Sequence, residues 1–215
     1  LTIEYDGTKF CGWQIQEKGV RTVQGKIKHA LERILKEPIT LIGAGRTDSG
    51  VHALGQVAHF KANASIAPET LLKALNANLP NDIAILKVQK VSNDFHAQYC
   101  AKSKIYRYTI LNQQTRRVKN QGFYYQIARK LDVRLMKKES KTLLGRHDFR
   151  AFAASNPHAD DKAKKRSTIR TIKKISFNQL NGFLDIEIEA NGFLYKMVRN
   201  IVGTLIQIGI GKIEQ

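Results

Sequence analysis

The chain has 215 residues, 42% of them hydrophobic, which is enough to bury one large core or two small ones. Its 36 Lys and Arg against 18 Asp and Glu give a formal net charge of +18, and a charge of this size attracts a polyanion such as nucleic acid. The apolar stretch over 201–210 is interrupted by polar residues and is much shorter than the roughly 20 residues that span a bilayer, so we expect no membrane span.

The first half of the chain predicts six elements. Strands are expected over four segments whose apolar residues alternate or run together: 1–5, 39–44, 56–61 and 83–88. Two helices are expected between them, one over 23–35 behind Thr22 as its N-cap and one from Pro68 to about Asn78. The resulting order, β-α-β-β-α-β, is that of a ferredoxin-like domain.

The second half predicts most of the same order again. Its expected strands cover 103–111, 168–178 and 183–190, and its expected helices cover 131–144 and 194–208. The order ends one strand early, so we expect a further strand beyond Gln215. The expected fold class is α+β, with ferredoxin-like domains over 1–100 and 101–215 whose antiparallel sheets form a basic cleft.

The cysteines and histidines narrow the chemistry. Cys11 and Cys100 lie far apart and have no paired-ligand spacing, which favours a reducing compartment such as the cytoplasm and no disulfide. The six histidines occur without H-E-x-x-H or C-x-x-C, so we expect no metal site. The start of the chain has no pattern of a signal peptide.

The segment 43–52, G-A-G-R-T-D-S-G-V-H, holds one carboxylate, Asp48, among three glycines. Glycines permit backbone angles that other residues resist, so the main chain can approach a ligand while the segment presents a short acid. The G-x-G spacing would suit a phosphate-binding loop, but such loops open a helix and here a strand is expected to follow. Taken alone, the segment favours a structural role for Asp48 in closing a turn.

Six segments in register change that interpretation, because together they resemble the tRNA pseudouridine synthase A family. The signature-like segment is G-R-T-D-S-G-V-H-A at 45–53. The others are I-E-Y-D-G-T-x-F-x-G-W-Q near the start, N-A-N-L-P at 76–80, D-F-H-A at 94–97, Y-R-Y at 106–108 and M-V-R-N-I-V-G at 197–203. Since they span the whole chain in the family's order, they favour a catalytic role for Asp48.

The resemblance implies a cytoplasmic, cofactor-independent enzyme that isomerises uridine to pseudouridine. Its substrate would be uridines 38, 39 and 40 of the tRNA anticodon stem-loop, and it would act as a homodimer. The N-glycosidic bond breaks and uracil C5 rejoins the ribose, and a carboxylate suits this step because positive charge develops at C1′. By resemblance Asp48 is the nucleophile. Attack on the sugar and assistance to elimination both stay open.

The resemblance also assigns partners to Asp48. Arg199 is the expected counter-charge, since on a helical wheel it lies off the apolar stripe and on the same face as Gly203. Tyr106 is the family's active-site tyrosine, whose ring can stack on the extruded uracil and whose phenol can reach a proton at C5. Arg46 is expected to contact the flipped nucleotide or its phosphates.

His52 and Arg107 complete the expected RNA-binding set, although a structural role is an equal alternative for His52. Tyr108 shares the face of Tyr106 on the strand and is expected to fill the core, whereas Arg107 points to the other face. His147-Asp148 is not expected to be a catalytic pair, because adjacent residues on a regular element seldom face one another.

Several alternatives stay open at this stage. Either core or RNA-stacking positions suit Phe10 and Trp13, and either structural or RNA-contacting roles suit His59 and His96. The basic run 162–170 is expected to be a loop, either in contact with phosphates or solvated. Two rival functions are a non-catalytic RNA-binding protein and a small-molecule phosphate-binding enzyme. The first would need neither Asp48 nor Arg199, and the second would leave the +18 charge unexplained.

Overall fold

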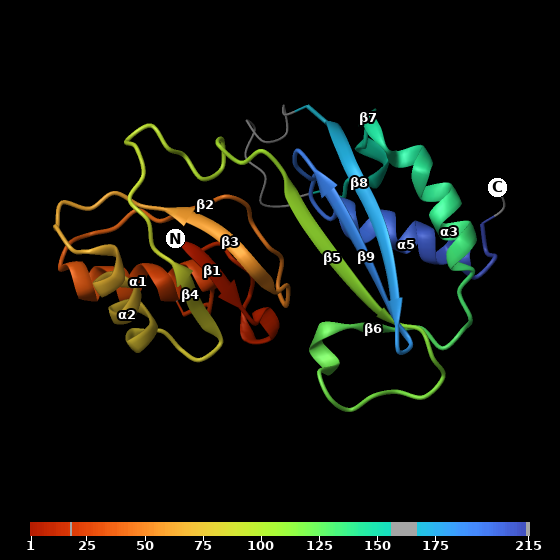
Figure 1. The fold of residues 1–215 in the computed structure, drawn as a ribbon, viewed down its shortest axis with the longest axis horizontal. Coiled ribbons are helices and arrows are strands. Elements are labelled where there is room, and N and C mark those ends of the chain that lie inside the picture. Colours follow the sequence, from red (N-terminus) through yellow and green to blue (C-terminus); the bar gives the residue numbers. More distant parts are fainter. Residues whose placement is uncertain (18, 156–166, 214–215) are drawn as a thin grey trace. The chain divides into compact units, whose positions relative to one another are not determined.

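The computed structural model describes residues 1–17, 19–155 and 167–213 (Figure 1). The chain divides into two compact units, unit 1 from Leu1 to Ala101 and unit 2 from Lys102 to Gln215. Each unit has its own sheet, its own helices and its own buried core. The fold class is α+β, as the sequence predicts.

Unit 1 has the predicted ferredoxin-like order of elements. They are β1 (Thr2–Tyr5), a short 3-10 turn η1 (Gly7–Lys9), α1 (Val23–Leu35), β2 (Ile42–Gly43), β3 (Ala53–His59), α2 (Pro68–Asn78) and β4 (Ile83–Lys87). The strands lie in the order β2-β3-β1-β4, and every neighbouring pair is antiparallel. This is the strand order in which two β-α-β units interleave.

The two helices of unit 1 cover one face of its sheet. On β1, Ile3 and Tyr5 are buried while Glu4 between them is exposed, which is the alternation of a half-buried strand. These side chains pack against apolar residues of α1 and α2, including Ile27, Leu31 and Leu75. The Thr22 side chain caps α1 by accepting from the Gly25 N–H at 3.3 Å, as the sequence predicts.

The strand expected over 39–44 is much shorter than predicted, because α1 takes up its backbone groups. The Ile39 N–H donates to Glu32 Oε1 at 3.1 Å, and Gln24 Nε2 donates to the Leu41 carbonyl at 2.8 Å. Only Ile42–Gly43 pairs with β3. Both Ile39 and Leu41 are buried, so the apolar pattern marked the core correctly but not the pairing.

The described part of unit 2 has one five-stranded sheet and two α-helices. Its elements are β5 (Lys104–Leu111), β6 (Tyr125–Gln126), α3 (Val133–Ser140), β7 (Gly145–Asp148), β8 (Ile169–Leu180), β9 (Phe183–Ala190) and α5 (Met197–Gly209), with 3-10 turns η2 (Gln121–Phe123), η3 (Lys141–Leu143) and η4 (Arg150–Phe152). The strand order is β6-β5-β9-β8-β7, and only the β5–β6 pair is parallel.

The long β8–β9 hairpin is the centre of unit 2 and agrees with the sequence. Asn181 and Gly182 join the strands with φ angles of 51° and 82°, the left-handed conformation of a two-residue hairpin turn. Every second residue of β9 is buried, and these side chains pack against α3 and α5. One face of the sheet is therefore the core face.

Other boundaries in unit 2 differ from the prediction. The helix expected over 131–144 ends at Ser140 in a 3-10 turn, and Gly145, with φ of 95°, begins an unpredicted strand. The helix expected from 194 begins at Met197, because Lys196 before it is left-handed. The strand expected beyond Gln215 lies outside the described residues, as does part of the basic run, 162–166.

Neither cysteine forms a disulfide, and both are exposed. Among the residues that the structure describes, no helix is long and apolar enough to cross a membrane.

Candidate active site

The loop over residues 44–52 connects β2 to β3, and its first residues are tied to the sheet. The Ala44 N–H donates to the Val57 carbonyl at 2.7 Å, and Gln56 Nε2 donates to the Gly45 carbonyl at 2.8 Å. In the middle of the loop, the Val51 N–H donates to the Asp48 carbonyl at 3.2 Å. This bond closes a turn whose third residue, Gly50, has φ of 77°, a conformation that favours glycine. The glycine therefore sets the backbone direction beside the acid.

The residue before Asp48 is held from two sides by the segment 5–13, which we call the platform. The Tyr5 hydroxyl and the Thr47 Oγ1 are 2.8 Å apart, and the Trp13 N–H donates to the Thr47 carbonyl at 3.1 Å. Burial raises the pKa of Tyr5 above its usual 10.0, so the hydroxyl stays protonated near neutral pH. Hydrogen bonds to the platform thus hold both the side chain and the main chain of Thr47.

The residues after Asp48 are fixed by the same platform. The Gly50 N–H and the Ser49 hydroxyl both donate to the Phe10 carbonyl, each at 3.2 Å. A carbonyl oxygen has two lone pairs and can accept both bonds. Asp48 therefore lies between neighbours that the platform holds on either side.

Two glycines let the platform approach this closely. A Cβ on Gly7 would lie 2.0 Å from the Val51 carbonyl oxygen, and a Cβ on Gly12 would lie 2.5 Å from the Thr47 carbonyl oxygen. Both distances are shorter than any ordinary contact, and Gly12 also has φ of 85°. Main chain therefore packs directly on main chain here, which only glycine permits.

Aromatic rings form the base of the platform. Trp13 and Phe10 are 1% and 2% exposed, and both belong to the core of unit 1. A Cβ on Gly43 would lie 2.7 Å from atoms of the Trp13 ring, so the start of the loop rests on this ring. Of the two roles that the sequence left open for these aromatics, the structure shows the core role.

Asp48 is half-buried, and Arg46 is exposed. Neither side chain makes a hydrogen bond or an ion pair with another described residue of unit 1. The backbone around them is fixed at several points while the two charged side chains remain available. The loop thus has a fixed backbone and charged side chains that no described residue of unit 1 holds.

His52 and Asp6 connect the end of the loop to the platform. The Gly7 N–H donates to His52 Nδ1 at 3.1 Å, and Asp6 Oδ1 lies 3.1 Å from the same nitrogen. The Thr8 hydroxyl donates to Asp6 Oδ1 and holds the pKa of this carboxyl below its usual 3.8, with smaller contributions from the Thr8 N–H and His52. These contacts give His52 a structural role, whatever else it contacts. Sequence reasoning assigned no role to Asp6.

Unit 2 carries the other expected site residues. Tyr106 and Tyr108 on β5 lie opposite Ile188 and Ile186, so they share one face of their strand, as predicted, and this is the core face of the sheet. The Tyr106 ring is half-buried and packs edge-to-face on Phe193, with 5.0 Å between the ring centroids. Phe193 lies in the turn that leads into α5. Tyr106 therefore sits at the end of the sheet where α5 begins.

Arg107 points to the opposite face, as predicted, and has a partner there. Its Nη2 lies 2.7 Å from Glu187 Oε1 on the neighbouring strand, and its Nε donates to the same oxygen at 2.8 Å. The two side chains are 50% and 37% exposed. An ion pair this exposed stabilises a fold by about 1 kcal/mol or less. Little free energy is therefore lost if Arg107 leaves Glu187 for another anionic partner.

Arg199 is the third residue of α5 and is exposed. Its neighbours fix the helix: Met197 and Ile201 are buried in the core, and Asn200 Nδ2 donates to the Phe152 carbonyl at 2.8 Å. In the described part of unit 2, the guanidinium has neither an ion pair nor a hydrogen bond. The prediction that it lies off the apolar stripe is confirmed.

His59, His96 and His147 make local contacts. His147 Nε2 lies 2.7 Å from the Leu144 carbonyl, and Asp148 Oδ1 accepts from the Arg150 N–H at 3.0 Å, so the two are not bonded to each other. The His59 and His96 rings lie 4.8 Å apart at the end of β3. Over residues 1–17, 19–155 and 167–213, no group of three or more potential ligands is placed to hold a metal ion.

Comparison with known proteins identifies the family. The profile described as tRNA pseudouridine synthase matches residues 1–100 and 140–215. A tRNA pseudouridine synthase A of Thermoanaerobacter sp. strain X514 is 46% identical over 215 residues, which cover 100% of this chain and 85% of that protein. The namesake of Acetivibrio thermocellus is 46% identical over 214 residues, with coverage of 100% and 85%. A tRNA pseudouridine synthase A 2 of Clostridium perfringens is 42% identical over 212 residues, with coverage of 99% and 84%.

Proposed function

The chain belongs to the tRNA pseudouridine synthase family, and on that premise we propose that Asp48 is the nucleophile with which it converts uridine to pseudouridine. The enzyme is an isomerase that acts on uridines of tRNA. Substrate and product contain the same atoms, because only the bond between base and sugar changes position. Such a reaction needs a group that stabilises the positive charge at C1′, or bonds to this carbon, while the base turns.

A single observation carries the proposal: the side chain of Asp48 is available while the main chain on both sides of it is fixed. Thr47 and Ser49 are bonded to the platform, whereas the carboxylate has no partner among the described residues of unit 1. A structural acid in a turn would use its oxygens to accept local N–H groups, as Asp6 does with Thr8. Asp48 does not, which favours a role in chemistry.

The proposed reaction has two substitutions at C1′. An oxygen of Asp48 bonds to C1′ as the bond between C1′ and N1 breaks, and the uracil leaves with the electron pair. The uracil turns, and C5 attacks C1′ and displaces the carboxylate. C5 then loses its proton and N1 gains one, so atoms and charge balance. The carboxylate is unchanged at the end.

The other site residues are proposed to act around this step. Arg199 is the proposed counter-charge of Asp48, a role that suits its exposed guanidinium, which has no ion pair or hydrogen bond in the described part of unit 2. Tyr106 stacks on the extruded uracil and assists proton transfer at C5. Arg46, two residues before the acid, contacts the flipped nucleotide or its phosphates. His52 and Arg107 contribute further RNA contacts.

The substrate site and the assembly are proposed from the resemblance to the A family. We propose that the target uridines are 38, 39 and 40 of the anticodon stem-loop, and that the enzyme acts in the cytoplasm as a homodimer. Transcripts with a single uridine at one of these positions test the first point. Sedimentation at micromolar concentration tests the second, since a homodimer has twice the 24.3 kDa of the chain.

The decisive experiment compares wild type with Asp48→Asn and Asp48→Ala on unmodified tRNA. Asparagine keeps the shape of the side chain and removes its charge. We expect both variants to bind tRNA in a filter assay and to form no detectable pseudouridine in a chemical assay. A variant that still forms pseudouridine would overturn the role of Asp48. A wild type that binds without conversion would favour the RNA-binding alternative.

A further inference from the structure

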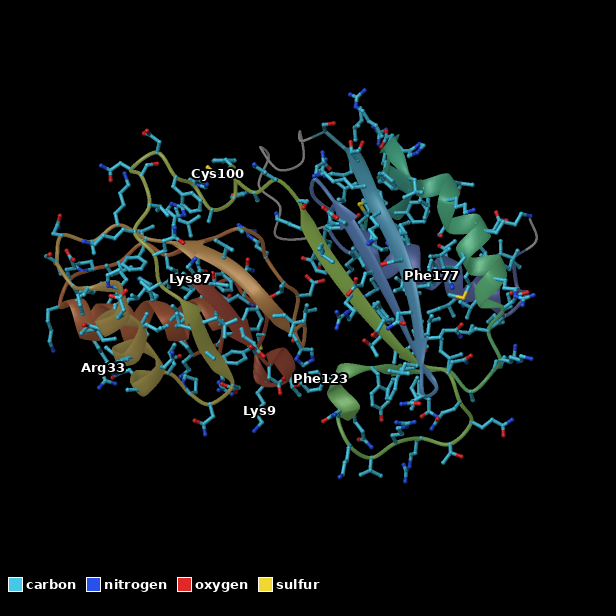
Figure 2. The ribbon with its side chains drawn as sticks, viewed as in Figure 1. Lys9, Arg33, Lys87, Cys100, Phe123 and Phe177 are labelled. Atoms are coloured by element: carbon cyan, nitrogen blue, oxygen red, sulfur yellow. The ribbon has the colours of Figure 1, made fainter. Side chains whose placement is uncertain are left out.

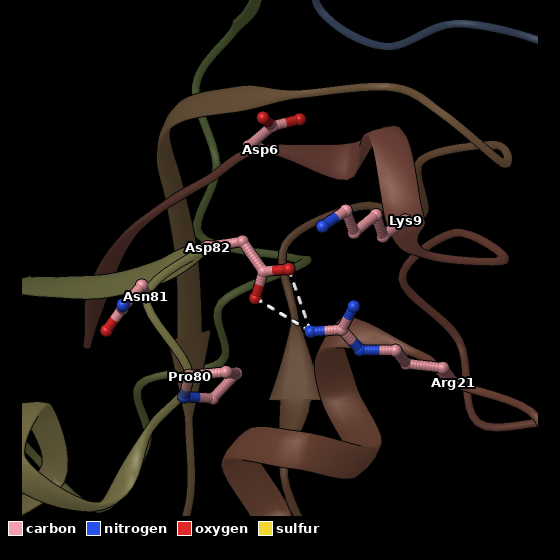
Figure 3. A pocket seen from close by; sticks show the side chains of 6 residues that line it. All are labelled: Asp6, Lys9, Arg21, Pro80, Asn81 and Asp82. Atoms are coloured by element: carbon pink, nitrogen blue, oxygen red, sulfur yellow. Dashed lines mark hydrogen bonds and ion pairs between the residues drawn. The ribbon is translucent and has the colours of Figure 1, made fainter.

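A hollow of about 380 Å³ lies beside the platform of unit 1 (Figure 3). Its lining residues are Asp6, Lys9, Arg21, Pro80, Asn81 and Asp82. Arg21 is clamped in it: Nη2 donates to both carboxylate oxygens of Asp82, at 2.9 and 2.8 Å, and the guanidinium lies 4.3 Å from the centroid of the Phe10 ring. Figure 3 shows the Lys9 amine directed into the hollow. A fixed cation and a free one thus face the same space.

A second hollow, of about 390 Å³, has only basic residues among the charged residues that line it. It is lined by Arg21, Lys26, His29, Ala30, Arg33, Ala77, Asn78, Leu79 and Pro80. Lys26, His29 and Arg33 are exposed and lie three and four residues apart on α1, so they form one stripe along the helix. The end of α2 and the residues after it form the opposite wall.

The two hollows share Arg21 and Pro80, so they lie side by side, and we call them together the α1 groove. Lys9 and Arg33 mark its two ends, and in Figure 2 both lie along the same edge of unit 1. The two acids in the lining are both near Lys9, and each has its own partners: Asp82 holds Arg21, and Asp6 holds Thr8 and His52. Among the described residues, Lys9, Lys26 and Arg33 have no side-chain partner.

We propose that the α1 groove binds backbone phosphates of the tRNA, at a place distinct from the site of reaction; this inference rests on the proposed function. The groove begins at Asp6, whose partner His52 is four residues after Asp48, and it leads away along α1. A strand of RNA that follows it therefore presents nucleotides beyond the one that reacts. Its lining contains no Phe, Tyr or Trp on which a base can stack, so it suits phosphates rather than bases.

Binding to the groove is expected to show in the salt dependence of affinity. Each phosphate contact releases counterions, so the logarithm of the binding constant falls as the logarithm of the salt concentration rises. Losing one contact makes this negative slope shallower by about 1. Lys26→Ala/Arg33→Ala removes two contacts from the end of the groove that has no acid. We expect its slope to be less negative than that of wild type by about 2. Between 50 and 200 mM salt, the wild type would then lose roughly tenfold more affinity for tRNA than the variant.

Matched variants separate the groove from charge alone. Lys73→Ala/Lys87→Ala removes two exposed lysines of unit 1 that line neither hollow, and we expect it to keep the wild-type slope. Lys26→Arg/Arg33→Lys keeps both cations and is also expected to keep it. Thermal unfolding shows that each variant is folded. Equal slopes in the groove variant and wild type, or an equal loss in the Lys73/Lys87 variant, would overturn the proposal.

Ethylation interference tests the contact directly. Phosphates whose ethylation weakens wild-type binding but not binding by Lys26→Ala/Arg33→Ala are those that the groove holds, and we expect such phosphates outside the reacting nucleotide. The same pattern in both proteins would contradict the groove.

The two proposals fail in different ways. If the wild type shows the groove's salt dependence but forms no pseudouridine, the proposed function is wrong and the groove stands. If the wild type forms pseudouridine and the groove variant keeps its slope, the function stands and the groove is wrong.

Discussion

The close contact between the platform and the 44–52 loop predicts that Gly12→Ala slows the reaction. The new Cβ would lie 2.5 Å from the Thr47 carbonyl oxygen, so this carbonyl must retreat by about 0.9 Å to reach the 3.4 Å of an ordinary contact. Thr47 precedes Asp48 directly, and a misplacement of about 1 Å in a catalytic group can slow a reaction by roughly 100-fold. We expect the single-turnover rate to fall 10- to 100-fold.

Gly12→Ala also strains the backbone, because φ at this position is 85°. Three other glycines separate the two effects. Gly50 has φ of 77° with open space around it, Gly7 meets the Val51 carbonyl at 2.0 Å without a positive φ, and Gly55 has neither problem. Alanine at Gly50 should therefore lower the free energy of unfolding by about 1–2 kcal/mol, and alanine at Gly55 should change it little.

The assay pairs single-turnover pseudouridine formation with urea unfolding for the four alanine variants. The expected order of rates is Gly55→Ala equal to wild type, Gly50→Ala intermediate, and Gly12→Ala and Gly7→Ala slowest. A wild-type rate in Gly12→Ala would refute the argument that the platform positions the acid. An equal loss of rate in Gly55→Ala would refute it as well, since that variant creates no contact.

Three further predictions concern single interactions. Tyr5→Phe removes the hydroxyl that holds Thr47, so we expect the free energy of unfolding in urea to fall by about 1 kcal/mol; an unchanged value would mean that water replaces the bond. The pKa of His59 is lowered below its usual 6.5 by burial and, to a smaller extent, by nearby positive charges, so the folded state favours the neutral ring. The stability that this preference contributes is present above pH 6.5 and is lost as the pH falls below it. The urea midpoint should therefore drop more between pH 7 and pH 5 in wild type than in His59→Gln, and parallel curves would contradict this. Arg107→Gln should leave stability within about 1 kcal/mol of wild type because its pair with Glu187 is exposed, and a larger loss in thermal unfolding would show that the pair is structural.

Local signals in the sequence predicted the helices of unit 1 well. Thr22 and Pro68 are start signals that act within one turn, and both helices begin where these residues predict. The strand over 39–44 was predicted too long, because the backbone groups of Ile39 and Leu41 bond to side chains of α1. No pattern within the strand itself reports such bonds.

The candidate site was also predicted only in part, and again the local features were the ones predicted. The sequence identified Asp48 as the acid of its loop, and it placed Tyr106 and Arg107 on opposite faces of their strand, because alternation is a local property. It did not reveal that Glu187 is the partner of Arg107, since 80 residues separate them and only the register of β5 with β9 brings them together. It also gave Asp6 no role.

The platform explains why two of the family-like segments, residues 3–14 and residues 45–53, occur together. Gly7 and Gly12 belong to the first segment, and the carbonyls that they accommodate, of Val51 and Thr47, belong to the second. Neither segment alone shows in its own residues what its glycines are for. Together they pack main chain on main chain, which fixes the position of Asp48 without using its carboxylate. Hydrogen bonds to a carboxylate stabilise its charge and occupy its lone pairs, so a platform that bonds only to the neighbours of Asp48 leaves its oxygens available for the reaction that we propose.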